Sequence, residues 1–392
     1  MKAIILVIDG LADRPVKALN YKTPLEASDR NNLNALAKKG ITGILDPISP
    51  GIRAGSDTSH LAILGYDPFK VYTGRGPFEA SGMGIEITGG DVAFRCNFAT
   101  VDNNLIVKDR RAGRIENTEE LEKAITEQVK LEVDYEFKSL KYRAALVLKG
   151  KGLSCEVSDI DPHESGVKVK KLEALKKEAE KTAEILWDFS IKAHRVLKEY
   201  PINKDRKLPA NFLLARGAGI TPELRSFKEK YNLNAACIAT TAIIKGITKL
   251  AGFDIIEAEA DYSARISQAI DALNTRDIVL INIKEADEAG HDNKPEEKIR
   301  VIEKLDRSMD RLLEFVIENY LVVLPDHSTP CGVGEHTGDT VPVLIAGPEV
   351  RSDSVERFDE RSTTLGGLGR IRAKHIMPII LDLINKSHKF GA

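Results

Sequence analysis

Side chains of the types that can bind metal ions or act as nucleophiles follow predicted strands or open a predicted helix. Seven of them form one set: Asp9, Ser56, Asp287, His291, Asp326, His327 and His336. Their donor atoms are oxygens and imidazole nitrogens, with no thiolate among them. Such a set suits two Mn²⁺-, Mg²⁺- or Zn²⁺-like ions rather than a structural zinc site. The pattern therefore predicts a metal-assisted reaction.

Ser56 is the expected nucleophile of this set. A serine hydroxyl is a weak nucleophile at neutral pH, and a bound dication favours its alkoxide and holds the attacking and leaving oxygens. Gly55 allows close approach of the backbone, and a helix that starts at Ser56 directs free N–H groups at a phosphate. The chain contains no GxxxxGK(S/T) segment, so this is not a Walker loop. Taken alone, Ser56 is also compatible with an ordinary helix cap.

The other members of the set also have simpler interpretations when each is taken alone. Asp9 with Gly10 is compatible with a turn, and Asp287 with His291, four residues apart, with a surface contact on a helix. Asp326 and His327 on an apolar strand are harder to explain, because burying both without partners costs free energy. The order and shared position of all seven at strand ends favour a functional site.

The elements that must position these residues alternate between strand and helix in both terminal parts of the chain. Predicted strands cover residues 3–8, 41–48, 212–214, 236–239, 255–258, 278–283, 321–324 and 343–345. Predicted helices cover residues 29–39, 296–317 and 370–385. This alternation predicts a parallel sheet covered by helices on both faces, with functional residues past the carboxyl ends of the strands.

The middle of the chain has a different order of predicted elements. Short strands are predicted at 93–101, 105–108, 140–149 and 153–158, and helices at 118–129 and 169–200. Hairpins combined with helices indicate an α+β module. We therefore predict a core domain built from 1–70 and 206–392, with 71–205 inserted into it as a second domain.

Composition excludes several classes of protein. The 392 residues include 57 Lys and Arg against 59 Asp and Glu, a near-balance that argues against a nucleic-acid-binding protein. No apolar run approaches the length of a membrane span, and the first residues lack the pattern of a signal peptide. The four scattered cysteines favour a reducing cytoplasm over a disulfide framework.

The sequence resembles the archaeal-type 2,3-bisphosphoglycerate-independent phosphoglycerate mutases of the alkaline phosphatase superfamily. The segments that carry the resemblance are 5–10 (ILVIDG), 55–68 (GSDTSHLAILGYDP), 73–80 (TGRGPFEA), 91–98 (DVAFRCNF), 109–115 (DRRAGRI), 161–164 (DPHE), 215–219 (ARGAG), 283–292 (IKEADEAGHD) and 325–342. The resemblance implies an α/β fold with an alkaline-phosphatase-like, mainly parallel core sheet, helices on both faces and an inserted α+β domain.

The resemblance also implies a role for each residue of the set. Each of two ions would have three protein ligands: Asp287, His291 and His336 for one, and Asp9, Asp326 and His327 for the other. Ser56 would be the phosphorylated nucleophile and would also contact metal. Mn²⁺ is the expected ion, with Co²⁺, Mg²⁺ and Zn²⁺ as alternatives.

In the wider family the inserted domain supplies arginines for the substrate's phosphate and carboxylate, which suit guanidinium forks. By resemblance, Arg111 and Arg114 are the leading candidates. Weaker candidates, any of which could be a structural charge, are Arg75, Arg95, Arg216 and Lys245. Asp161 and His163 would either handle protons or cap a turn. His60 would either contact the phosphate or only satisfy the helix.

The implied activity interconverts 3-phosphoglycerate and 2-phosphoglycerate through a phosphoserine, in glycolysis and gluconeogenesis, without 2,3-bisphosphoglycerate. We therefore expect a cytoplasmic isomerase with a small-molecule substrate, no nucleic-acid or membrane partner, and homo-oligomers as an open question. A metal-dependent phosphatase or phosphotransferase acting on another small phosphorylated metabolite is the alternative, because the same metal core serves several activities. A non-catalytic sensor is disfavoured, because the nucleophile and every ligand are present.

Overall fold

The structure is a computed structural model that describes residues 1–389 and 391. The chain divides into two compact units, Met1–Val71 with Leu224–Ala392, and Tyr72–Glu223. The first boundary lies beside the predicted one, whereas the second lies at 223/224 instead of 205/206. The reason is strand β7 (Phe212–Gly219), which we predicted in the core domain but which pairs antiparallel with β3 (Val92–Val101) of the smaller unit.

The larger unit is built on a mainly parallel sheet. In the described part of the chain its strands lie in the order β13-β2-β12-β11-β1-β10-β8-β9. Their bounds are β1 (Ala3–Ile8), β2 (Ile41–Asp46), β8 (Ala235–Ala239), β9 (Asp254–Glu257), β10 (Ile278–Ile283), β11 (Tyr320–Leu324), β12 (Val341–Ala346) and β13 (Gly369–Arg372). Within this order β12 runs antiparallel to both of its neighbours, and the other pairs are parallel.

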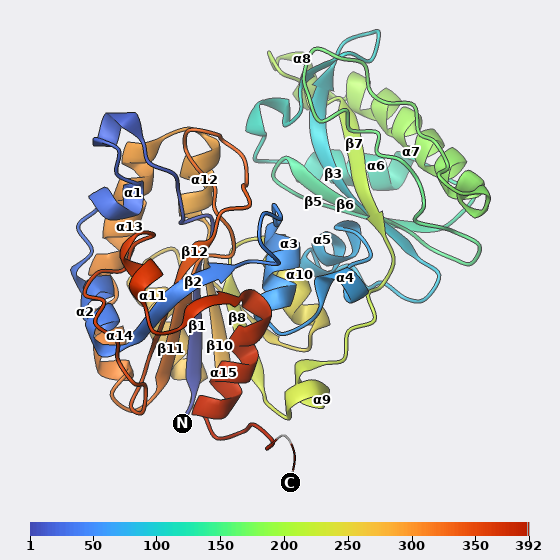
Figure 1. The fold of residues 1–392 in the computed structure, drawn as a ribbon. Helices are drawn as coiled ribbons and strands as arrows, with labels where there is room; N and C mark the ends of the chain where they lie inside the picture. Colours follow the sequence, from blue (N-terminus) through green and yellow to red (C-terminus); the bar gives the residue numbers. More distant parts are fainter. Residues whose placement is uncertain (390, 392) are drawn as a thin grey trace. The chain divides into compact units, whose positions relative to one another are not determined.

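Helices cover both faces of this sheet (Figure 1). Alternate side chains of β1, such as Ile4 and Leu6, pack on one face against residues of α2 (Asn31–Lys39), α11 (Tyr262–Ala272), α13 (Pro295–Arg307) and α14 (Asp310–Phe315). On the other face lie α3 (Ser56–Ile63), α10 (Ala242–Leu250) and α15 (Ile376–Leu383). Shorter helices are α1 (Pro24–Ala27), α4 (Pro68–Val71), α9 (Phe227–Tyr231) and α12 (Glu285–His291).

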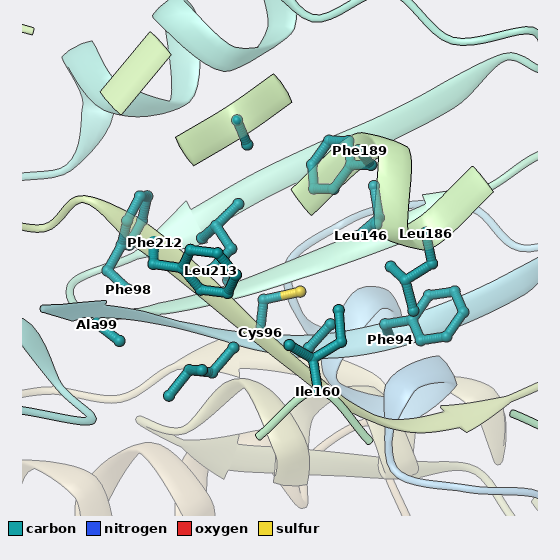
Figure 2. Packing of buried hydrophobic residues seen from close by; sticks show 14 of the residues in the cluster. Phe94, Cys96, Phe98, Ala99, Leu146, Ile160, Leu186, Phe189, Phe212 and Leu213 are labelled. Carbon is teal, nitrogen blue, oxygen red and sulfur yellow. The ribbon is translucent and has the colours of Figure 1, made fainter. Parts of the chain in front are cut away.

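The smaller unit is an α+β module around an antiparallel sheet. Strands β4 (Val107–Asp109), β3, β6 (Arg143–Leu148) and β5 (Tyr135–Leu140) lie in that order, and β7 pairs with β3. Helices α6 (Glu119–Gln128), α7 (Glu180–Glu199) and α8 (Pro201–Lys204) accompany a large apolar core, and α5 (Gly76–Gly82) packs on β3 and β6. Figure 2 shows β3, β7 and α7 meeting in that core through Phe98, Phe212 and Phe189.

The predicted fold class is confirmed, but several element bounds are wrong. Residues 153–158 form no strand and contribute only an isolated bridge between Val157 and Ala174. The helix predicted at 169–200 starts at Glu180, because residues before it pair with neighbouring loops instead. The helix predicted at 296–317 is divided between α13 and α14, and the start of the one predicted at 370–385 is strand β13, which pairs with β2.

Among the described residues, no helix combines the length and the apolar character needed to cross a membrane.

Candidate functional site

The sheet brings the predicted residues to one edge. Strands β1, β10 and β11 are adjacent and parallel, so their carboxyl ends meet, and Asp9 and Asp326 lie just past two of them. Helix α12, which follows β10, carries Asp287 and His291. His336 reaches the same edge because β12 is antiparallel to β11, which places the start of β12 beside the end of β11.

One group of ligand-type side chains consists of Asp287, His291 and His336. The Nε2 atoms of His291 and His336 lie 3.4 and 3.5 Å from the carboxylate oxygens of Asp287. On each ring Nδ1 is 2.8 Å from a backbone carbonyl oxygen, that of Gly334 for His291 and that of Ala54 for His336. A carbonyl only accepts, so each Nδ1 carries a proton, and in the neutral ring Nε2 then has the lone pair that a metal ion needs.

The second group consists of Asp9, Asp287 and His327, with Asp326 beside it. The Nε2 atom of His327 is 3.3 Å from Asp9 Oδ1 and 3.3 Å from Asp326 Oδ2. These side chains are almost completely buried. Asp287 belongs to both groups, so the structure joins the two sets of three ligands expected from the sequence into one continuous cluster.

The cluster contains buried carboxylates, one of which has an oxygen without a hydrogen-bond partner. Divalent cations would neutralise the carboxylates and bind that oxygen. Burial, reinforced by neighbouring carboxylates, raises the pKa of Asp9 and raises that of Asp326 well above its usual value. Burial acts in the same direction on Asp287, but Lys284 and the neighbouring imidazoles outweigh it and hold its pKa well below the ordinary value. Asp326 Oδ2 is buried without a hydrogen-bond partner. Buried, incompletely satisfied carboxylates fit hard divalent cations.

Lys284 belongs to this site, and the sequence reasoning missed it. Its Nζ atom lies 3.0 Å from Asp9 Oδ1 and 2.5 Å from Asp287 Oδ2. The two carboxylates outweigh burial and raise its pKa. The sequence contained a signal for Lys284, because it directly follows the strand that ends at Ile283. The other site residues were predicted at such strand ends.

Ser56 is the first residue of α3, as predicted, and its hydroxyl does not cap the helix. The N-cap residue is Gly55, and the hydroxyl of Thr58 makes the capping contacts, 3.2 Å from both the backbone N and O of Gly55. The Ser56 Oγ atom instead lies 3.1 Å from His327 Nε2. The predicted nucleophile therefore faces the cluster of ligand-type side chains.

His60 is satisfied within the fold. Its Nδ1 donates to the backbone carbonyl of Ser56 at 2.7 Å, and its Nε2 accepts from Asn282 Nδ2 at 3.3 Å. Burial lowers the pKa of the ring to about 4. Of the two interpretations left open for His60, these contacts favour the structural one.

Basic residues of the smaller unit lie around two buried carboxylates, Glu79 and Asp161, and we call this set the basic group. Glu79 lies 3.0 Å from Arg75 Nε and 3.6 Å from Arg95 Nε. Asp161 lies 3.4 Å from Arg216 Nη1, which in turn is 3.3 Å from His163 Nδ1.

Two further arginines join this group without having been predicted. Arg110 binds both oxygens of Asp161, at 3.0 and 2.7 Å, and Arg143 contributes to holding the pKa of Glu79 low. Arg110 stands in the same DRRAGRI segment as the two leading candidates, so its position was a usable signal.

The remaining predicted substrate residues make other contacts. The guanidinium of Arg111 stands over the ring of Tyr142, 5.9 Å from its centroid, and that of Arg143 stands over the same ring at 5.3 Å. Arg114 lines a cavity of the smaller unit together with Arg206. Lys245 belongs to the larger unit, where its Nζ atom is 2.7 Å from Glu257.

Comparisons with known proteins find similarity to phosphoglycerate mutases. A family model described as 2,3-bisphosphoglycerate-independent phosphoglycerate mutase matches residues 37–203. A protein of that name from Methanothermobacter thermautotrophicus is 49% identical, with both chains fully covered. A solved protein structure from Pyrococcus horikoshii is 39% identical with a TM-score of 0.86, covering 100% of this chain and 99% of that one. The cofactor-independent phosphoglycerate mutase from Thermoplasma acidophilum is 38% identical with a TM-score of 0.68, covering 98% and 100%.

Proposed function

Because the chain belongs to the 2,3-bisphosphoglycerate-independent phosphoglycerate mutase family, we propose that it interconverts 3-phosphoglycerate and 2-phosphoglycerate through a phosphoserine at Ser56. The observation that carries the proposal is the position of the Ser56 hydroxyl. It is 3.1 Å from His327 Nε2 and lies beside the cluster of buried carboxylates and imidazoles. No 2,3-bisphosphoglycerate is needed, because the protein itself stores the phosphoryl group between the two half-reactions.

The residues present fit two divalent cations, with Mn²⁺ as the expected metal. Asp287, His291 and His336 would hold one ion, and Asp9, Asp326 and His327 the other. When bound, such ions favour the ionised serine and neutralise charge on the transferred phosphoryl group. The buried Asp326 oxygen without a hydrogen-bond partner supports this assignment.

The chain's own residues account for the two displacements. Ser56 Oγ loses its proton and attacks the phosphorus of 3-phosphoglycerate, the bond from phosphorus to the C3 oxygen breaks, and the C3 oxygen takes up one proton to end as the C3 hydroxyl, so the proton count is unchanged. In the second displacement the C2 hydroxyl attacks the phosphoserine and loses its proton, and the serine hydroxyl is restored. The start of α3 favours the negative charge that gathers near Ser56 in both steps.

We assign binding of the glycerate to arginines of the smaller unit, where Arg111 and Arg114 stay predicted substrate residues together with Arg75, Arg95 and Arg216. Arg75 donates a hydrogen bond to Glu79, and Arg95 and Arg216 lie within ion-pair distance of Glu79 and Asp161, so the two carboxylates hold these guanidinium groups together before substrate arrives. Fixed guanidinium forks bind carboxylate and phosphate bidentately. Retention of the glycerate by these residues is what separates a mutase from a phosphatase.

The test is an assay of the purified full-length chain with 3-phosphoglycerate and Mn²⁺, without 2,3-bisphosphoglycerate. Both 2-phosphoglycerate and inorganic phosphate are followed. We expect 2-phosphoglycerate to be the main product. Release of mainly inorganic phosphate would instead favour a metal-dependent phosphatase.

A further inference from the structure

Thr329 lies outside the predicted ligand set and contacts two of its members. Its side chain is completely buried, and its Oγ1 atom is 2.6 Å from Asp287 Oδ1 and 3.1 Å from His327 Nδ1. A hydroxyl has a single proton to donate, and an ionised carboxylate only accepts. The Thr329 proton therefore goes to Asp287, and the His327 Nδ1–H donates to the Thr329 oxygen. This arrangement leaves a lone pair on His327 Nε2.

The backbone of Thr329 is fixed by a buried ion pair that no catalytic step uses. Lys298 on α13 is completely buried, and its Nζ atom donates to Asp13 Oδ2 at 2.8 Å and to the Thr329 carbonyl at 3.0 Å. The Thr329 amide donates to the Ala12 carbonyl at 3.1 Å. The pair thus joins the segment after β1, which begins with Asp9, to the segment after β11, which contains Asp326 and His327.

Helix α12 approaches Thr329 closely from the other side. A Cβ atom placed on Gly290 would lie 2.4 Å from the Thr329 carbonyl oxygen. Gly290 stands between Asp287 and His291, the two ligand-type residues of that helix. The absence of a side chain at 290 therefore allows the Thr329 hydroxyl to reach Asp287.

We propose that Thr329 is a positioning residue of the metal site: its hydroxyl fixes the tautomer of His327 and the orientation of Asp287, and the Lys298–Asp13 pair holds it in place. This inference rests on the proposed function, since it requires that these residues bind divalent cations. Groups that orient metal ligands in this way usually change metal affinity by about 10–100-fold when removed.

The experiment measures Mn²⁺ binding to the metal-free, full-length protein by isothermal titration calorimetry. Thr329→Val removes the hydroxyl and keeps the shape of the side chain, whereas Thr329→Ser keeps the hydroxyl. We expect Thr329→Val to weaken Mn²⁺ binding by about 10–100-fold and Thr329→Ser to bind with an affinity close to that of the wild type.

Thr248→Val is the matched control. Thr248 is also completely buried, and its hydroxyl donates to the Ile244 carbonyl at 2.7 Å, within α10. We expect this variant to lose thermal stability in the metal-free state without weakening Mn²⁺ binding. Unchanged Mn²⁺ affinity in Thr329→Val, or equal weakening in Thr329→Ser or Thr248→Val, would overturn the inference and leave the proposed metal site standing. Failure of the wild type to bind Mn²⁺ would overturn both.

Discussion

At the residue scale, two different hydroxyls at the start of α3 cap the helix and contact the ligand cluster. Thr58 makes the capping contacts with Gly55, so the Ser56 hydroxyl is available to contact His327. Neighbouring hydroxyls on the same helix have other surroundings. Ser59 is completely buried, and its oxygen has no hydrogen-bond partner. This difference makes the role of Ser56 testable by comparing two similar substitutions.

We predict that Ser56→Ala removes essentially all phosphoryl transfer, because no other hydroxyl on α3 contacts the ligand cluster at this point. The metal-free fold should be retained, since the serine makes no capping bond. Turnover is measured with 3-phosphoglycerate, and mass spectrometry of quenched wild-type protein should place phosphate on the peptide containing Ser56. Ser59→Ala, the matched control, should remain active. A phosphate found reproducibly on another residue would refute the covalent route.

A second residue-scale prediction concerns the basic group. Arg216→Ala should lower mutase turnover by about 10²-fold or more, because removing a hydrogen-bonded charge costs about 2–5 kcal/mol. Release of inorganic phosphate should fall much less, since glycerate lost between half-reactions exposes the phosphoserine to water. Lys245→Ala is the control and should stay close to wild type, because Lys245 pairs with the exposed Glu257. Equal loss of both activities in Arg216→Ala would indicate a structural role.

At the element scale, α13 is joined to the segments that follow β1 and β11 by an ion pair buried inside the larger unit. Lys298 directs its hydrogen bonds at Asp13, Ala12 and Thr329. Asp13 in turn accepts from the Cys331 amide at 3.1 Å. The pair thus fixes segments far apart in the sequence, which makes it a structural connection as well as the support of Thr329.

We predict that Lys298→Met lowers the free energy of unfolding by about 3–5 kcal/mol, because it leaves Asp13 buried without its cation. The double variant Asp13→Asn/Lys298→Met should be more stable than Lys298→Met alone, since the asparagine carries no charge and can still accept from Cys331. Chemical denaturation of the metal-free proteins measures both. A double variant that is less stable than Lys298→Met would contradict this explanation.

At the scale of the whole molecule, the ligand-type residues come from segments distributed along most of the larger unit. Asp9 lies near the start of the chain, whereas His336 lies more than 300 residues later. Such a site exists only in the folded chain. Ions bound there therefore stabilise the fold by mass action.

We predict that Mn²⁺ raises the midpoint of thermal unfolding and that a chelator reverses the increase and abolishes activity. An ion at about 100 times its dissociation constant adds about 2.7 kcal/mol to the free energy of unfolding. Differential scanning calorimetry with and without Mn²⁺ measures the change. The increase should shrink in Asp326→Asn, which removes one buried charge from the cluster. Full activity in a verified metal-free sample would exclude metal dependence.

The sequence by itself determined the fold class and the edge of the sheet where chemistry is concentrated. Strand 3–8 is a continuous apolar run and strand 278–283 is apolar except for Asn282, and both are buried on both faces of the sheet. Residues directly after such strands, like Asp9, must lie at the carboxyl edge of the sheet, independently of the conformation of the loops that follow. Local pattern was sufficient there because strand burial and strand direction constrain these positions strongly.

Only the tertiary structure decided which side chains meet. Strand β7 belongs to the smaller unit because it pairs with β3, more than a hundred residues earlier, and no local pattern encodes that partner. Lys284 and Thr329 join the ligand cluster through contacts with Asp9 and Asp287, and Arg110 joins the basic group through Asp161. Each contact depends on distances between segments remote in the chain. Periodicity and residue type specify elements, whereas packing sets these distances.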